Sequence, residues 1–164
     1  MGRRDAPPWA GSVTPVGPPP DSVPHTNDLA YAGAVTGIWS GVLSLLVYLL
    51  ARLLGVPMEI QVGFAPELRE VSWLLPLLVP IAAAMAGALL TALLLGRRGA
   101  RRIAFWVGTA VAAASLWIPL VQPPDVLWST RIWLSVMHVI TWFLVVPQLA
   151  RIVGDSEPGQ YELR

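Results

Sequence analysis

Four apolar segments constrain this chain more than any other feature, because each is long enough to cross a lipid bilayer. They cover residues 29–54, 73–95, 103–121 and 132–152, and none contains an acidic residue. A helix of about 20 residues spans the ~30 Å hydrocarbon core of a membrane. Charged residues make up only 13 % of the chain, against about 25 % in a typical soluble domain. The sequence therefore predicts an all-α membrane protein, with a four-transmembrane-helix bundle in residues 29–152.

Polar segments flank this domain on both sides. Residues 1–28 contain seven prolines and almost no aliphatic side chains, a composition that cannot bury a core. We expect a disordered, Pro-rich tail there, without a cleaved signal peptide because it has no apolar run. Residues 153–164 are expected to form a short polar C-terminal tail.

The distribution of arginine predicts the orientation in the membrane. The short segment "GRRGARR" between the second and third apolar segments carries Arg97, Arg98, Arg101 and Arg102. Short loops rich in arginine stay in the cytoplasm, where they can face anionic headgroups. Four crossings then place both termini on that side, together with eight of the eleven arginines. We expect a multi-pass protein of the cell (inner or plasma) membrane with both termini cytoplasmic.

Small residues recur at helical spacing and predict close helix packing. Gly33, Gly37 and Gly41 form two overlapping GxxxG units, a spacing that lets helices approach closely in lipid. The second apolar segment offers Ala83, Gly87 and Thr91 at the same spacing, and the third offers Gly108. The motif is consistent with packing inside one chain and with a homo-oligomer, and both interpretations stay open.

The fourth apolar segment holds the one histidine outside the proline-rich tail, His138. At 100° per residue it lies within about 60° of Arg131, Ser135 and Trp142, which makes a polar stripe along one face. Ionisable residues inside membrane segments face the interior of a bundle and often mark function. We expect the hydroxyls of Ser40 and Ser44 to reach the imidazole. The predicted polar interior therefore comprises His138, Ser135, Trp142, Arg131, Ser40 and Ser44, serving either helix packing or function.

Several kinds of chemistry lack the residues they need. The chain has no cysteine, which excludes disulfides and thiolate ligands. A proton- or cation-coupled pump needs a carboxylate within the membrane, and the apolar segments hold none. A hydrolase triad needs an acid, and none accompanies Ser135 and His138. A metal site needs three or four ligands, and one histidine is too few. A net charge of +1 gives no field that would attract nucleic acid. We therefore expect no cofactor, no metal site and no nucleic acid partner, and the sequence favours a non-enzymatic protein without deciding it.

The longest connection, residues 55–72, combines two patterns. Apolar Met58 and Ile60 alternate with polar Glu59 and Gln61, which is typical of a half-buried extended segment. A helical turn carrying Glu67 and Glu70 is expected after Pro66. The connection is either a lid on the helix ends or a docking surface.

Two stretches, "LLARLLGVPMEI" and "MHVITWFLVVPQLAR", resemble the signature segments of a family of small bacterial four-helix integral membrane proteins. That family is catalogued as a domain of unknown function, and the resemblance covers roughly residues 29–152. It implies the same four-helix fold and a bacterial inner-membrane location. It implies no activity, substrate or cofactor.

We predict an integral inner-membrane protein that acts as a non-enzymatic accessory or interaction protein of a membrane complex. Its expected partners are the lipid bilayer and either a membrane protein or further copies of itself. The alternative is a small transporter, channel or sensor with a polar cavity around His138. A third option is a lipid-modifying enzyme that uses His138 as a base.

Overall fold

A computed structural model describes residues 24–61 and 67–158. It contains the helices α1 (Thr26–Leu53), α2 (Leu74–Ala92), α3 (Ala100–Leu120) and α4 (Trp128–Gly154), and the strands β1 (Glu59–Gln61) and β2 (Leu68–Glu70). All four helices are long and apolar enough to cross a membrane. The chain is therefore an all-α membrane protein with four transmembrane helices, as predicted. Of the tail predicted to be disordered, residues 1–28, residues 1–23 lie outside the described residues. Residues 26–28 are not disordered, because they form the first turn of α1.

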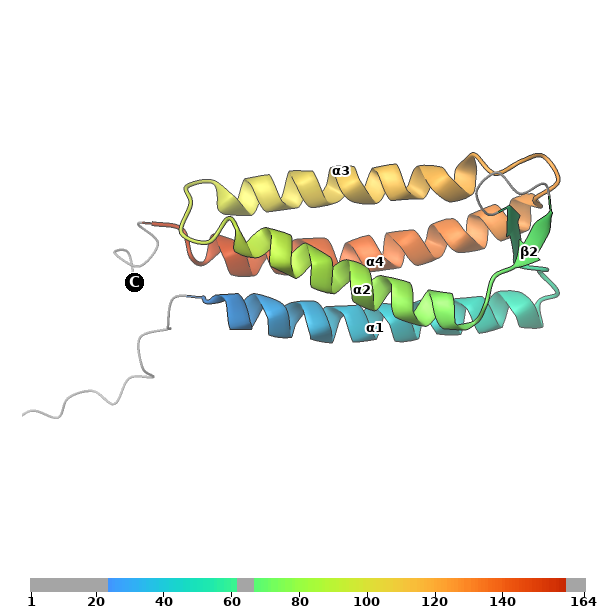
Figure 1. Cartoon of the computed structure of the whole chain (residues 1–164), viewed down its shortest axis with the longest axis horizontal. Helices are drawn as coiled ribbons and strands as arrows, with labels where there is room; N and C mark the ends of the chain where they lie inside the picture. Colours follow the sequence, from blue (N-terminus) through green and yellow to red (C-terminus); the bar gives the residue numbers. More distant parts are fainter. Residues whose placement is uncertain (1–23, 62–66, 159–164) are drawn as a thin grey trace, which may run out of the picture.

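The helices run side by side, and the connections gather at the two ends of the bundle (Figure 1). We call one end the loop end; it holds the start of α1, the end of α4 and the α2–α3 connection, residues 93–99. The other end, which carries β1 and β2, is called the hairpin end.

Two helices begin three residues before their predicted starts. At α1 the backbone N–H of His25 donates to Asp28 Oδ2 at 2.7 Å. An acidic side chain in the first turn also interacts favourably with the helix dipole. At α3 the first turn includes Arg101 and Arg102. These two residues, expected in a loop, are therefore helical.

α1 is the central helix of one half of the bundle, and α4 joins the two halves. α1 packs against both α2 and α4, whereas α3 packs mainly against α4. One buried apolar cluster near the loop end includes Leu29, Ala84 and Leu149. A second cluster near the hairpin end includes Tyr48 and Met137. α3 is the outermost helix, since Ala100 and Pro119 are its buried residues.

The glycines of α1 pack against another helix of the same chain. A Cβ added to Gly33 would lie 2.7 Å from Ala88 Cβ, and one added to Gly37 would lie 3.0 Å from Ala84 Cβ. A Cβ on Gly41 would collide with the backbone carbonyl oxygen of Leu77. The predicted close packing of these three glycines is thus present, and its partner is α2.

The face of α2 that meets α1 differs from the predicted one. Ala84 and Ala88 are buried there, whereas Ala83 is exposed. A Cβ on Gly87 would make only an ordinary contact, 3.5 Å from Leu149 Cδ1. Gly87 is therefore not a close-approach position, because α2 turns the neighbouring alanines toward α1. Gly108 of α3 does lie at a close contact, 2.9 Å from Val146 Cγ1 for an added Cβ.

The described residues of the 55–72 connection, 55–61 and 67–72, form a lid at the hairpin end, where Met58 and Val71 are buried in one cluster with Tyr48. β1 pairs antiparallel with β2, with Ile60 opposite Arg69. The extended prediction is confirmed for residues 59–61, but the helical turn expected around Glu67 and Glu70 is wrong, because residues 68–70 complete the hairpin. The Tyr48 hydroxyl donates to the Val71 carbonyl at 2.7 Å, so α1 holds the lid in place. Val62, Phe64 and Pro66 lie outside the described residues.

Candidate functional site

His138 lies on α4 beside an open crevice of about 260 Å³ between α3 and α4. Its Nδ1 is 2.9 Å from the carbonyl oxygen of Leu134, one turn earlier. Because a carbonyl oxygen can only accept, Nδ1 carries the hydrogen in the neutral ring and Nε2 is left as an acceptor. Among the described residues, no hydrogen bond reaches Nε2. The crevice is lined by Thr109, Ala112, Ala113, Leu116, His138, Val139 and Trp142.

The structure does not bring Ser40 and Ser44 to His138, which corrects the sequence expectation. The Ser40 hydroxyl donates to Thr141 Oγ1 at 2.9 Å. Ser44 is fully buried, and its hydroxyl has no hydrogen-bond partner within the described part of the chain. At 100° per residue, His138 is rotated away from Met137, which packs toward α1. The imidazole consequently faces α3 and does not connect α4 to α1.

Trp142 shares the crevice with His138 and bonds directly to α3. Its indole Nε1–H donates to Thr109 Oγ1 at 3.1 Å. Thr109 was not predicted as a site residue, although it directly follows the packing residue Gly108. The interhelical role of Thr141 was missed as well. In both cases the available signal was a hydroxyl inside an apolar helix.

Arg131 was expected to line the polar interior, but it closes the α3–α4 connection instead. Its side chain is 7 % exposed and donates to three backbone carbonyls: Leu120 at 3.1 Å, Pro123 at 2.6 Å and Val126 at 3.2 Å. The guanidinium carbon also lies 4.7 Å from the centre of the Trp128 ring. A guanidinium has five donors in a rigid fork and suits such a cluster of carbonyls.

Ser135 likewise serves its own helix, because its hydroxyl donates to the Arg131 carbonyl at 2.8 Å. The predicted stripe therefore divides into two parts. His138 and Trp142 line the crevice, whereas Arg131 and Ser135 stabilise the start of α4.

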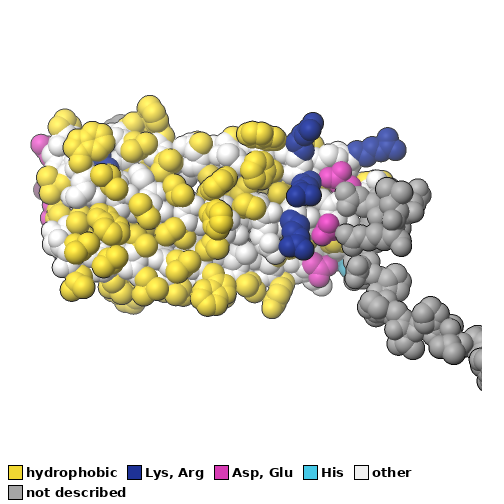
Figure 2. All heavy atoms as spheres, turned by 180° about the vertical axis from the view of Figure 1, so that it is seen from behind, with side chains coloured by type: hydrophobic (Ala, Val, Ile, Leu, Met, Phe, Trp, Pro, Cys, Tyr) yellow, Lys and Arg dark blue, Asp and Glu magenta, His cyan; other side chains and the backbone are white. Residues whose placement is uncertain are grey.

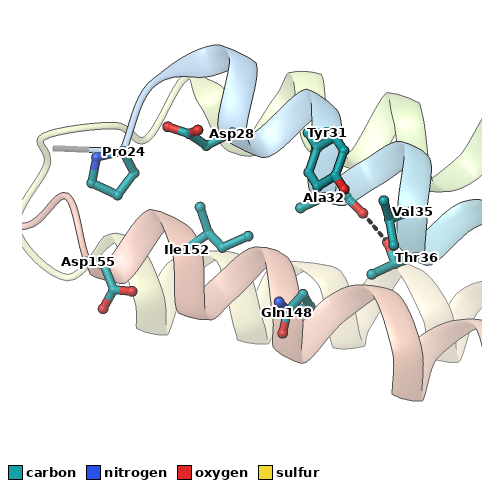
Figure 3. Close-up of a pocket in the computed structure, with 9 residues that line it drawn as sticks. All are labelled: Pro24, Asp28, Tyr31, Ala32, Val35, Thr36, Gln148, Ile152 and Asp155. Atoms are coloured by element: carbon teal, nitrogen blue, oxygen red, sulfur yellow. Dashed lines mark hydrogen bonds between the residues drawn. The ribbon is translucent and has the colours of Figure 1, made fainter. Parts of the chain in front are cut away.

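A second cavity, of about 450 Å³, opens between α1 and α4 at the loop end. Figure 3 shows Asp28 and Tyr31 on α1, with Gln148 on α4 and Asp155 just beyond it. Ala32 and Ile152 supply apolar lining. The cavity is an open cleft with acidic side chains at its edge, and none of the predicted site residues lines it.

The α2–α3 connection is held by the segment that follows α4. The Ser156 hydroxyl accepts from the Gly96 N–H at 3.0 Å. The two carboxylate oxygens of Glu157 accept from the N–H groups of Gly99, at 3.0 Å, and Arg101, at 2.9 Å. Residues expected to begin a polar tail are thus structural, because they bind the loop and the first turn of α3. The side chains of Arg97, Arg98, Arg101 and Arg102 are all exposed.

Taken together, the crevice can accept a hydrogen bond or a proton at Nε2 of His138 but has no acid to orient that ring. Within residues 24–61 and 67–158, no group of three or more His, Cys, Asp or Glu is placed to hold a metal ion.

Comparison with known proteins places the chain in a family. Residues 24–155 match the model of a family described as "Family of unknown function (DUF6069)". No curated protein and no solved structure matches the chain. The family match covers most of the sequence and all four helices. The protein therefore belongs to DUF6069, a family of unknown function, as a membrane protein with four transmembrane helices.

Proposed function

We propose that this protein is a non-enzymatic accessory protein that binds a transmembrane helix of another membrane protein through the outer face of α3. The observation that carries the proposal is the position of α3, which packs mainly against α4. Only 11 % of its most apolar 18-residue window is buried, the smallest share among the four helices. Trp106 and Trp117 are 63 % and 66 % exposed.

The exposed side chains of α3 suit a partner helix. Four exposed residues fall within about 80° of one another on the helix, and they define the α3 outer face: Trp106, Ala110, Ala114 and Trp117. Small residues allow a second backbone to approach closely in lipid, where little hydrophobic force drives helices together. The two tryptophans flank the alanines and offer large contact areas.

The α3 outer face is also held rigidly. Arg131 bonds to the carbonyl of Leu120, the last residue of α3. Trp142 bonds to its middle at Thr109, and Glu157 bonds to its first turn. A fixed surface loses little conformational entropy on binding. A homo-oligomer through the α1 glycines has no support, because α2 already occupies them.

We further propose that the protein lies in a bacterial inner membrane with the loop end in the cytoplasm. The arginine-rich α2–α3 connection supports this orientation, since short basic loops stay inside. Figure 2 shows arginine side chains forming a band near this end, with acidic side chains next to them and hydrophobic side chains spread over the rest of the visible face.

The proposal is tested by isolating the tagged full-length chain from its native membranes after crosslinking. Ala110→Leu with Ala114→Leu enlarges the α3 outer face, and Ala82→Leu with Ala86→Leu is the matched control on exposed positions of α2 with the same spacing. We expect one membrane protein near one-to-one with the wild type and the α2 control, and its loss with the α3 variant. Equal recovery from both variants, or recovery of the chain alone from the wild type, would reject the proposal.

The second candidate function is a small transporter or sensor centred on His138. It is favoured by one observation, the Nε2 atom without a partner at the crevice between α3 and α4. This function requires a pH-dependent flux across vesicles containing the purified protein, which His138→Ala removes while the fold is retained. Flux equal to that of empty vesicles would reject it.

A further inference from the structure

Among the residues that the structure describes, five arginines at the loop end are exposed: Arg97, Arg98, Arg101, Arg102 and Arg151. In the described ranges, none of their guanidinium groups takes part in a hydrogen bond or an ion pair. The arginines at the hairpin end include partnered ones, since Arg52 pairs with Glu70 at 2.7 Å and Arg131 binds three carbonyls. The loop end thus presents its positive charge outward.

Two of the three described acidic residues at this end are engaged with backbone amides. Asp28 accepts from the N–H of His25, and Glu157 accepts from the N–H groups of Gly99 and Arg101. The third, Asp155, lies beyond the end of α4 and has a partner of its own. Neither Asp28 nor Glu157 forms an ion pair with an arginine of the loop end within the described residues.

The backbone that carries the arginines is fixed in shape. Gly96 and Gly99 turn the chain at φ angles of 69° and 75°, which favour glycine. Ser156 and Glu157 bind the N–H groups of the same two glycines. α4 also ends directly against α3, since a Cβ on Gly154 would lie 2.8 Å from Arg101 Cβ. The backbone from which Arg97, Arg98 and Arg101 extend is therefore held in place before any ligand arrives.

We propose that these arginines form a binding site for the phosphate of anionic phospholipids, and that Glu157 and Ser156 hold the loop in its binding shape. Guanidinium groups match phosphate oxygens in charge and in geometry. The amide N–H groups at the start of α3 are already bound by Glu157, so the ligand is held by the side chains.

A lipid is the occupant because apolar surface begins where the charge ends. Ile103 follows Arg102 directly and is 44 % exposed, and Trp106 lies one turn further along α3. A phospholipid bound by its phosphate would lay its acyl chains along this helix. A soluble phosphate has no group to cover that surface. The arginines that would bind the phosphate are not part of the α3 outer face, although the apolar surface beside them shares Trp106 with it. The phosphate site and the protein-binding surface therefore depend on different residues, and either proposal can fail alone.

The test measures binding of phosphatidylglycerol and phosphatidylcholine to the purified full chain by native mass spectrometry from a neutral detergent. We expect phosphatidylglycerol to bind about tenfold more tightly or better, as expected for several cations acting on one headgroup, and salt to weaken it. Replacing Arg97, Arg98, Arg101 and Arg102 by Gln should abolish the preference. Arg69→Gln, an exposed position at the hairpin end, should leave it unchanged. A preference that survives the fourfold replacement would overturn the site.

The variant Glu157→Ala distinguishes a lipid site that depends on the shape of the loop from attraction by positive charge alone. The variant makes the loop end more positive, so charge alone predicts tighter binding of phosphatidylglycerol. Loss of the fixed loop predicts weaker binding, by several-fold, and we expect this result. Tighter binding would overturn the role of Glu157. Should Glu157→Ala not stay folded, Ser156→Ala removes one loop bond without changing the charge and should also weaken binding. The last measurement adds inorganic phosphate to the complex with phosphatidylglycerol. If phosphate displaces the lipid at a concentration similar to that of the lipid, soluble phosphate is the ligand and the lipid assignment is overturned.

Discussion

Trp142 and Thr109 join α4 to α3 within the membrane-spanning region, where the indole N–H donates to the threonine hydroxyl oxygen at 3.1 Å. Beside this bond, Gly108 allows Val146 to approach closely. Together with the bonds of Arg131 and Glu157 near the two ends of α3, this contact favours one rotation of α3 about its own axis. That rotation sets which side chains of α3 face away from the bundle, and the proposed partner surface depends on it.

A double-mutant cycle should detect this bond. Trp142→Phe removes the donor and Thr109→Val removes the acceptor, and each leaves much of the packing. We expect a coupling free energy of about 0.6 kcal/mol, and at most about 1.7 kcal/mol, the range measured for such bonds inside membranes. Reversible unfolding in mixed detergent micelles supplies the four free energies. Strict additivity of the two single changes would show that the bond contributes nothing.

Two glycine replacements should have opposite effects. Gly41→Ala places a methyl group against the backbone carbonyl of Leu77, which cannot move without separating α1 from α2. We expect a loss of about 1–3 kcal/mol in the free energy of unfolding, as for other overpacked sites. Gly87→Ala is the control, because its Cβ would lie 3.5 Å from a flexible Leu149 side chain. There the helix propensity of alanine should leave stability unchanged or raise it by up to about 1 kcal/mol. Equal effects of the two replacements would contradict the close packing of α1 on α2.

Arg131→Lys should destabilise the protein although it conserves the charge. A lysine ammonium cannot reproduce the fork that reaches Leu120, Pro123 and Val126 at once. Each hydrogen bond to a charged group is worth about 1.5–3 kcal/mol, so we expect a loss of about 2 kcal/mol or more and a lower Tm. The thermal transition in detergent measures it, with Arg69→Lys as the exposed control. An unchanged Tm would mean that the α3–α4 connection does not depend on the guanidinium.

Tyr48→Phe should loosen the lid without unfolding the bundle. The hydroxyl of Tyr48 is bonded to the carbonyl of Val71, directly after β2. Its removal leaves a backbone acceptor unpaired, which costs about 1–3 kcal/mol where the group is buried. Hydrogen–deuterium exchange should become faster in residues 56–61 and 67–71 and stay unchanged in α3. Unchanged exchange in residues 56–61 and 67–71 would show that Tyr48 does not hold the lid.

The helices could be predicted from the sequence because membrane crossing imposes length and hydropathy on each segment separately. The close approach at Gly33, Gly37 and Gly41 was predictable for a similar reason, since three small residues on one face have few other uses. The extended conformation of residues 59–61 followed from alternation. In contrast, the helical turn at Glu67 was inferred from a single proline, and strand pairing with β1 overrides that local preference.

The candidate site was harder to predict, because helical spacing gives the direction of a side chain but not the helix that lies there. α4 contacts α1 on one side and α3 on another. The direction of His138 was compatible with either neighbour, and the structure places it toward α3. The structural role of Arg131 could not be predicted, for a different reason. Its partners are backbone carbonyls, which every residue carries, so no pattern of side chains marks them.

Site-specific crosslinking in native membranes is the most direct test of the proposed partner surface. A photoreactive amino acid is placed at Ala110 on α3 or, as the control, at Leu46 on α1, which is 56 % exposed. We predict one protein adduct of defined mass from position 110 and only lipid adducts from position 46. Lipid adducts alone from both positions, or an adduct of two copies of this chain from position 110, would contradict the binding of a separate membrane protein by α3.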